Sequence, residues 1–160
     1  MSKENMGFFF KVYPDGRLIS IIRDPRNWFP SAARHGSKKY SDLKKALTQW
    51  NKNALSMLKN KDKYKHRIII ISFEDLIQNI EPVMRSLADF LNIEFDDILL
   101  VPTFNKFPMV ANTSFRAEEA GIVDSTIFRY KTLTHEELDI IDKMTRDNYK
   151  EVLNKADRAG

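Results

Sequence analysis

The 160-residue sequence has no cysteine, which excludes disulfide bonds and thiolate chemistry. This absence suits a reducing compartment, so we expect a cytoplasmic protein. No apolar run approaches the roughly 20 residues that a membrane-spanning helix needs. The first residues also lack the basic and long apolar regions of a signal peptide. We therefore expect a chain without a membrane anchor or export signal.

Glycine is scarce as well, with five residues in the chain. The sequence has no repeat, no low-complexity segment and no Gly/Ser-rich linker, so we expect residues 1–160 to form a single domain. A metal site is not expected, because no cysteine is present and the three histidines fall in unrelated places. Those histidines are His35, His66 and His135.

The composition is that of a globular protein, with 42% hydrophobic and 30% charged residues. Lys and Arg exceed Asp and Glu by 26 to 22, which gives a formal net charge of +4. Such a charge favours anionic partners without naming one. Nucleic acid, phosphorylated cofactors and acidic glycans all remain open at this point.

Hydrophobic patterning predicts an α/β fold. Two short aliphatic runs, "RLISII" (Arg17–Ile22) and "RIIIIS" (Arg67–Ser72), are typical of strands covered on both faces in a parallel sheet. Apolar residues at three- and four-residue steps predict amphipathic helices. Such helices are expected from Leu43 to Leu58, from Ile80 to Leu91 and from Leu138 to Val152, and the segment from Pro25 to about His35 can also be helical. The long aperiodic segment from Val101 to about Arg129 is expected to be functional.

Arg23 ends the first predicted strand, at the edge where parallel sheets bind ligands. Asp24 suits the cap of the next helix, and Pro25 suits its first position. The Arg23 guanidinium offers a fork of donors for a phosphate, and Ser31 can add a hydroxyl two turns later. Pro30 predicts a kink just before Ser31. The alternative is that Arg23 pairs with a carboxylate and Ser31 is an ordinary helix residue.

Two other groups of charged residues have structural and functional interpretations. Glu74 and Asp75 follow the second strand, where they can form an acid/base pair or begin the next helix, and the second interpretation is favoured. Lysines flank the helix that contains Trp50, as a solvated face or a surface for an acidic glycan. These are Lys38, Lys39, Lys44, Lys45, Lys59, Lys61, Lys63 and Lys65.

Three motifs in order resemble the sulfotransferase family. Arg-Asp-Pro-Arg after a strand, with Ser31 eight residues beyond Arg23, resembles the segment that binds the 3′-phosphate of 3′-phosphoadenosine 5′-phosphosulfate (PAPS). "IIIISFEDL" (Ile68–Leu76) and the following "IEPVMRSLADFLNI" resemble a later strand and helix of the family. "PTFNKFPMVANTSF" (Pro102–Phe115) resembles its loop over the adenine. The resemblance extends from about Phe10 to about Tyr149 and implies the parallel-sheet, P-loop-NTPase-like sulfotransferase fold.

The resemblance implies roles for particular residues in binding PAPS as co-substrate. Arg23 and Ser31 would hold the 3′-phosphate, Thr113 would lie at the adenine edge, and Phe115 would stack on the adenine face. The alternative for Thr113 and Phe115 is packing within the loop. Some members of the family have Arg-Lys-Gly after this loop, to grip the 3′-phosphate.

The sequence departs from the family pattern at several positions. In place of Arg-Lys-Gly it has "FRYKTLT" (Phe128–Thr134), where Arg129 is the candidate, and Arg116 is an equal substitute. Phe73 stands where cytosolic members have a tyrosine near the adenine. It lacks the hydroxyl and offers packing alone.

The family's phosphosulfate-binding strand, P-loop-like turn and helix have no counterpart before Arg23. The resemblance therefore implies the C-terminal portion of the fold, incomplete or truncated at its N-terminus, and no catalytic residue is assigned. The preferred interpretation is a sulfotransferase that supplies the 3′-phosphate and adenine side of the donor site, for an unidentified hydroxyl or amine acceptor, which can be a small molecule or a glycan. The alternatives are an inactive remnant or partner-binding protein and, from charge alone, a nucleic-acid-binding domain. A homodimer or a separate N-terminal half is the expected protein partner.

Overall fold

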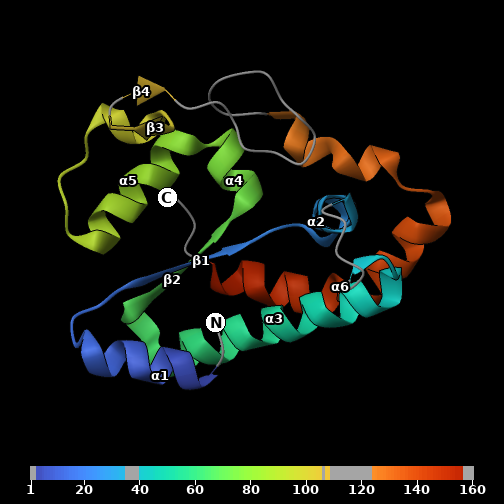
Figure 1. Ribbon diagram of the computed structural model, residues 1–160, viewed down its shortest axis with the longest axis horizontal. Helices are drawn as coiled ribbons and strands as arrows, with labels where there is room; N and C mark the ends of the chain where they lie inside the picture. Colours follow the sequence, from blue (N-terminus) through green and yellow to red (C-terminus); the bar gives the residue numbers. More distant parts are fainter. Residues whose placement is uncertain (1–2, 35–39, 106, 109–123, 157–160) are drawn as a thin grey trace.

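The fold of the computed structural model is built around two parallel strands, β1 (Leu18–Ile22) and β2 (Ile68–Ser72). The structure describes residues 3–34, 40–105, 107–108 and 124–156 (Figure 1). Leu18 pairs with Ile68 at one end of the two strands, and Ile22 pairs with Ser72 at the other. All five residues of β2 are buried, which confirms that its uniform aliphatic sequence is covered on both faces.

Six α-helices within the described residues surround the strands. They are α1 (Lys3–Val12), α2 (Pro25–Arg34), α3 (Leu43–Tyr64), α4 (Phe73–Gln78), α5 (Ile80–Leu91) and α6 (His135–Lys155). Shorter elements complete the chain: the 3₁₀ helices η2 (Lys65–Arg67), η3 (Asp97–Leu100) and η4 (Asp124–Thr132), and the antiparallel pair β3 (Thr103–Phe104) and β4 (Phe107–Pro108). The four segments expected to be helical are confirmed as helices. None of the helices in the described part is long and apolar enough to cross a membrane.

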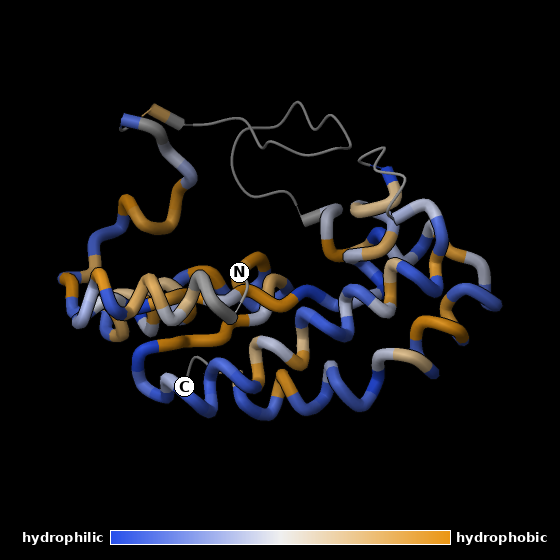
Figure 2. Tube along the Cα trace, turned by 60° about the horizontal axis from the view of Figure 1, so that its bottom comes forward, coloured by the Kyte–Doolittle hydropathy of each residue, from blue (hydrophilic) through white to orange (hydrophobic). Residues whose placement is uncertain are grey.

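Helices cover the two strands on both faces (Figure 1). On one face α3 and α6 lie side by side, and Trp50 and Leu58 of α3 pack with Ile70 and Val152. On the other face Val83 and Leu87 of α5 pack on β2. In Figure 2, α3 and α6 show alternating hydrophilic and hydrophobic stretches, as amphipathic helices do.

Local hydrogen bonds explain where the long helices begin. The Asp42 side chain caps α3 by accepting from the Lys45 backbone N–H at 2.8 Å. At the start of α6, the Thr134 hydroxyl accepts from the Glu137 N–H at 3.2 Å, and the Glu137 carboxylate accepts from the Thr134 N–H at 2.8 Å. This reciprocal capping box satisfies two backbone donors that a helix N-terminus otherwise leaves unpaired.

Helix α1 was not expected from the sequence. Its segment "KENMGFFFKV" places Met6 and Phe10 in the core but leaves Phe8 exposed, so the three consecutive phenylalanines obscure the helical period. Gly16, in the connection between α1 and β1, packs closely against the Phe9 ring. A Cβ atom there would lie 2.9 Å from the Phe9 ring.

The outer part of β1 is less covered than β2. Ile19 and Ile21 are 41% and 47% exposed, whereas their neighbours on the same face, Ile69 and Ile71, are buried beneath α5. The apolar face of the strand pair thus continues beyond the helix that covers it.

Candidate functional site

Arg23 lies where β1 ends and α2 begins. The Asp24 carboxylate accepts from the Arg26 backbone N–H at 2.8 Å, so it caps α2, and Pro25 is the first helical residue. These positions agree with the expected helix start. Helix α2 continues through Pro30 to Arg34, and Ser31 lies on its buried side. The side chains of Arg23 and Ser31 consequently meet.

The Arg23 guanidinium is held by neutral groups. Its Nη1 donates to the Ser31 hydroxyl at 3.1 Å, and its Nη2 donates to the Thr126 carbonyl of η4 at 2.5 Å. The Phe73 ring centroid lies 4.6 Å from the guanidinium carbon, within the range of a cation–π contact. The buried Nε has no hydrogen-bond partner among the described residues. Arg23 therefore has an unused donor in a place where unpaired polar groups cost free energy.

Arg129 approaches the same hydroxyl from η4. Its Nη1 donates to Ser31 Oγ, so two guanidinium groups share one serine oxygen. The Ser31 hydroxyl itself contacts the Asn27 carbonyl at 3.4 Å. The Asn27 side chain accepts from the Tyr130 N–H at 3.1 Å, which fixes η4 against α2. We refer to Arg23, Ser31 and Arg129 as the arginine cluster.

The arginine cluster brings two guanidinium groups together at one serine hydroxyl. Burial, together with the charges of Arg23 and Arg34, lowers the pKa of Arg129 to about 10. Burial also lowers the pKa of Arg23, although the carboxylates of Glu74 and Asp24 act in the opposite direction. Like charges held together in a partly dry site favour binding of an anion, which would offset both the repulsion and the desolvation.

Among the described residues no carboxylate forms an ion pair with Arg23, although Glu74 and Asp24 are near enough to act on its charge. The nearby Glu74 carboxylate instead accepts from the Asp24 backbone N–H, at 3.2 Å from each oxygen. Burial raises the pKa of Glu74. Glu74 and Asp75 occupy the first turn of α4, whose cap is Ser72, as the structural interpretation of this acidic pair predicted.

A pocket of about 380 Å³ opens beside the arginine cluster, beyond the carboxyl ends of the strands. It lies between α2, α4 and η4. Its lining residues are Asp24, Arg26, Asn27, Glu74, Gln78, Ile127, Phe128 and Tyr130. Parallel α/β sheets bind ligands at this edge. The pocket is lined by chain neighbours of Arg23 and Arg129, including the acidic Asp24 and Glu74, and not by the arginine cluster itself.

The structure brings three of the five predicted binding residues together: Arg23, Ser31 and Arg129. Thr113 and Phe115 lie outside the described residues, as does Arg116. Phe73, which was expected to offer packing alone, also contacts the Arg23 guanidinium.

Sequence reasoning missed two groups at the site. The contact between Asn27 and Ser31 follows from their helical spacing and could have been found. The Thr126 carbonyl has no signal in the sequence, because any residue supplies such a group.

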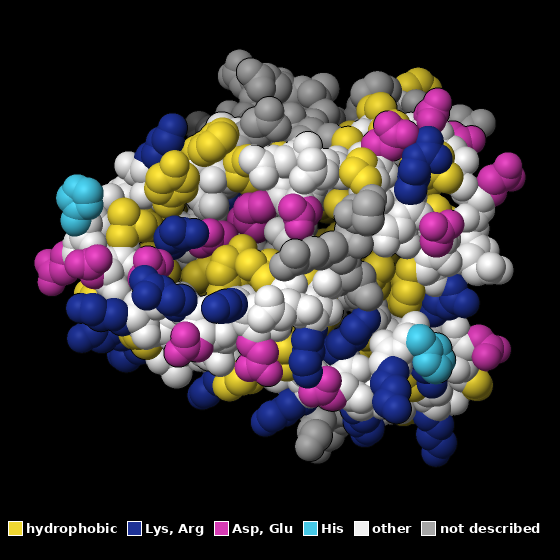
Figure 3. Space-filling model, turned by 180° about the vertical axis from the view of Figure 1, so that it is seen from behind, with side chains coloured by type: hydrophobic (Ala, Val, Ile, Leu, Met, Phe, Trp, Pro, Cys, Tyr) yellow, Lys and Arg dark blue, Asp and Glu magenta, His cyan; other side chains and the backbone are white. Residues whose placement is uncertain are grey.

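Other candidate sites receive less support from the described part of the chain. No three of its His, Asp and Glu side chains are placed to hold a metal ion. Basic side chains are numerous on the lower half of the face in Figure 3, but acidic ones are interspersed among them. Mixed charge of this kind is typical of a solvated face.

Comparisons with known proteins agree with the fold. The family model described as "Sulfotransferase family" matches residues 2–97. A solved structure, described as the sulfotransferase domain from the curacin biosynthetic pathway, matches with a TM-score of 0.59 at 19% identity. The alignment covers 82% of this chain and 54% of that chain, so the protein spans about half the length of the solved one. At this identity the likeness shows a shared fold. No curated protein gives a significant match.

Proposed function

The chain belongs to the sulfotransferase family, and we propose that it takes part in sulfuryl transfer from PAPS to a hydroxyl or amine acceptor. In this proposal it supplies the 3′-phosphate and adenine side of the donor site, and it works in the cytoplasm. The observation that carries the proposal is the arginine cluster, in which Arg23 and Arg129 both donate to Ser31 at the end of β1.

The residues of the arginine cluster fit a phosphate group. A phosphate has several acceptor oxygens, and the cluster offers the Arg23 fork, the Arg129 guanidinium and the Ser31 hydroxyl. The buried and unpartnered Arg23 Nε is a further donor. Hydrogen bonds between charged groups contribute about 1.5–3 kcal/mol each, so two or three of them suffice for specific recognition. Burial is the main cause of the lowered pKa of Arg129, and the negative charge would also neutralise the repulsion from Arg23 that adds to it.

The adenine contacts belong to the proposal as well. Thr113 would lie at the edge of the base, and Phe115 would stack on its face, a contact that contributes about 1–3 kcal/mol in other nucleic-acid complexes. Phe73 has a different task, because its ring lies against the Arg23 guanidinium and restricts where the fork can point. The proposed site thus combines a preorganised phosphate end with a base-binding loop.

The bound co-substrate would supply the activated sulfuryl group, while the residues of this chain bind and orient its nucleotide end. Orientation matters because an in-line displacement requires the acceptor and the sulfur to be aligned. Transfer also requires positive groups near the phosphosulfate and a base for the acceptor. We assign neither of these to a residue of this chain.

Isothermal titration calorimetry with adenosine 3′,5′-bisphosphate tests the proposal. The wild-type chain should bind this nucleotide, and Arg23→Ala should weaken binding by about a hundredfold or more, because it removes at least two charge-assisted bonds. Arg85→Ala is the matched control, since Arg85 lies on α5 and pairs with Glu81 at 2.8 Å. Absence of binding by the wild type, or equal binding by Arg23→Ala, would contradict the proposal.

A further inference from the structure

The outer edge of β1 is a possible strand-pairing surface. Within the described residues β1 pairs with β2 alone, so one side of its backbone has no strand partner. Parallel sheets of two strands are rarely left uncovered. Proteins usually protect an edge strand with a charged side chain, a proline or a bulge. The sequence of β1, "LISII", contains no charged residue and no proline.

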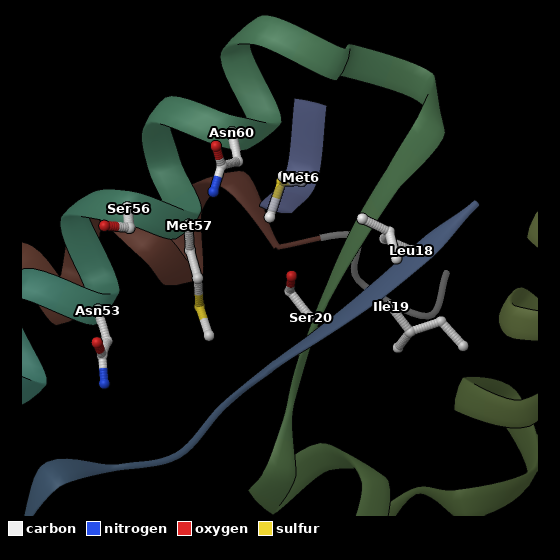
Figure 4. A pocket seen from close by; sticks show the side chains of 8 residues that line it. All are labelled: Met6, Leu18, Ile19, Ser20, Asn53, Ser56, Met57 and Asn60. Atoms are coloured by element: carbon white, nitrogen blue, oxygen red, sulfur yellow. The ribbon is translucent and has the colours of Figure 1, made fainter. Parts of the chain in front are cut away.

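Both faces of β1 are open near this edge. On the α5 side, Ile19 and Ile21 are 41% and 47% exposed. On the α3 side, a pocket of about 340 Å³ adjoins the strand. In Figure 4 the Ser20 hydroxyl points toward Met57 and Asn60 of α3, whereas Ile19 points to the opposite side of the strand. An added strand would therefore find apolar contacts on one face and polar groups on the other.

The pattern of β1 is the same in both directions about Ser20. One isoleucine precedes it and one follows it, and the outermost residues, Leu18 and Ile22, are also aliphatic. In an antiparallel pair centred on Ser20, Ile19 of one strand would lie opposite Ile21 of an identical strand. Apolar cross-strand pairs of this kind stabilise antiparallel sheets by about 0.2–1 kcal/mol each. An identical strand is thus complementary to the edge at every position.

We propose that a second copy of this chain pairs with the β1 edge in antiparallel orientation, with the two-fold axis at Ser20. The two strand pairs would form one four-stranded sheet, and the exposed isoleucines would cover one another. An isologous contact of this type closes at the dimer. The paired surface is at the low end of interface sizes, so the dimer should dissociate on dilution.

Analytical ultracentrifugation over a wide range of protein concentration tests this proposal. The wild type should be a dimer at high concentration and a monomer when diluted. Ile19→Lys should be monomeric throughout, because the lysine charge would be placed against Ile21 of the other copy on the apolar face of the sheet. Ile98→Lys is the matched control, since Ile98 is 43% exposed in η3, outside the strand pair. It should dimerise like the wild type.

A crosslinking experiment avoids reliance on a charged variant. The chain has no cysteine, so Ser20→Cys introduces a single thiol at the proposed axis. Directly opposite Cβ atoms in an antiparallel pair are about 4.5–5.5 Å apart, close enough for a disulfide after small adjustments. Oxidised glutathione as the oxidant should crosslink Ser20→Cys and leave Ser41→Cys, at an exposed position before the N-cap of α3, uncrosslinked.

Three results would overturn the proposal. A wild type that stays monomeric at every concentration would exclude pairing of this edge with a second copy. A dimer that persists in Ile19→Lys, or that is not crosslinked through Ser20→Cys, would place the interface elsewhere. Assemblies larger than a dimer would contradict the closed two-fold pairing.

Discussion

Replacing Arg129 with methionine separates a role in binding from a role in folding. The substitution removes one of the two guanidinium groups that meet at Ser31 but keeps an unbranched stem to fill space. If Arg129 is retained for an anionic ligand, the ligand-free protein should lose little stability, and the response to nucleotide should fall. A structural arginine would behave in the opposite way.

The expected change in stability follows from two opposing effects. Burial and the neighbouring arginines lower the pKa of Arg129 to about 10, which corresponds to at most about 3 kcal/mol of unfavourable free energy at neutral pH. Solvent screening reduces this to about 1–2 kcal/mol. Loss of the hydrogen bond to Ser31 costs about 0.5–1.5 kcal/mol. The two contributions nearly cancel, so Arg129→Met should change the free energy of unfolding by less than about 1 kcal/mol.

Urea unfolding with and without adenosine 3′,5′-bisphosphate measures both the stability of the ligand-free protein and its affinity for the nucleotide. We expect Arg129→Met to match the wild type without nucleotide and to bind the nucleotide about tenfold to a hundredfold more weakly, from the loss of one charge-assisted bond. Arg146→Met is the control, because Arg146 is exposed on α6 and pairs with Asp142. A loss of about 3 kcal/mol without nucleotide, combined with unchanged affinity, would refute the reasoning.

Two further predictions concern stability. Burial raises the pKa of Glu74 above 4.5, so the folded protein keeps a proton that the unfolded chain has lost, and stability falls as the pH rises through that window. The free energy of unfolding, measured with urea across this pH range, should fall less steeply for Glu74→Gln than for the wild type. Equal slopes for the two proteins would contradict the prediction. Thr134→Ala breaks the capping box of α6 and should cost about 1 kcal/mol in thermal or urea unfolding, whereas Thr134→Ser should cost much less. Equal losses in the two variants would argue against the cap.

Local sequence signals predicted the parallel strands and the contact between Arg23 and Ser31. A uniformly aliphatic run indicates a buried parallel strand, since few other environments accept it. Asp24 and Pro25 fix where α2 starts, and the helical period then places Ser31 near the strand end. All of these signals lie within a few residues of one another. The role of the pair in phosphate binding stays a prediction.

The remainder of the site depends on contacts that are distant in sequence. Arg129 meets Ser31 across 98 positions, and Thr126 meets Arg23 across 103. The segment that carries them was expected to be aperiodic, and it contains the 3₁₀ helix η4, whose period differs from that of an α-helix. Hydrophobic periodicity at the α-helical period therefore does not predict η4. Thr113 and Phe115 lie outside the described residues and stay predictions.

The central claim is that the arginine cluster recognises a 3′-phosphate, and a comparison of two nucleotides tests it most directly. Calorimetric titration of the wild-type chain with adenosine 3′,5′-bisphosphate and with adenosine 5′-monophosphate isolates the contribution of that one group. We expect the bisphosphate to bind at least about tenfold more tightly, because the 3′-phosphate forms charge-assisted bonds with Arg23 and Arg129. Equal affinities for the two nucleotides, or no binding of the bisphosphate, would contradict the claim.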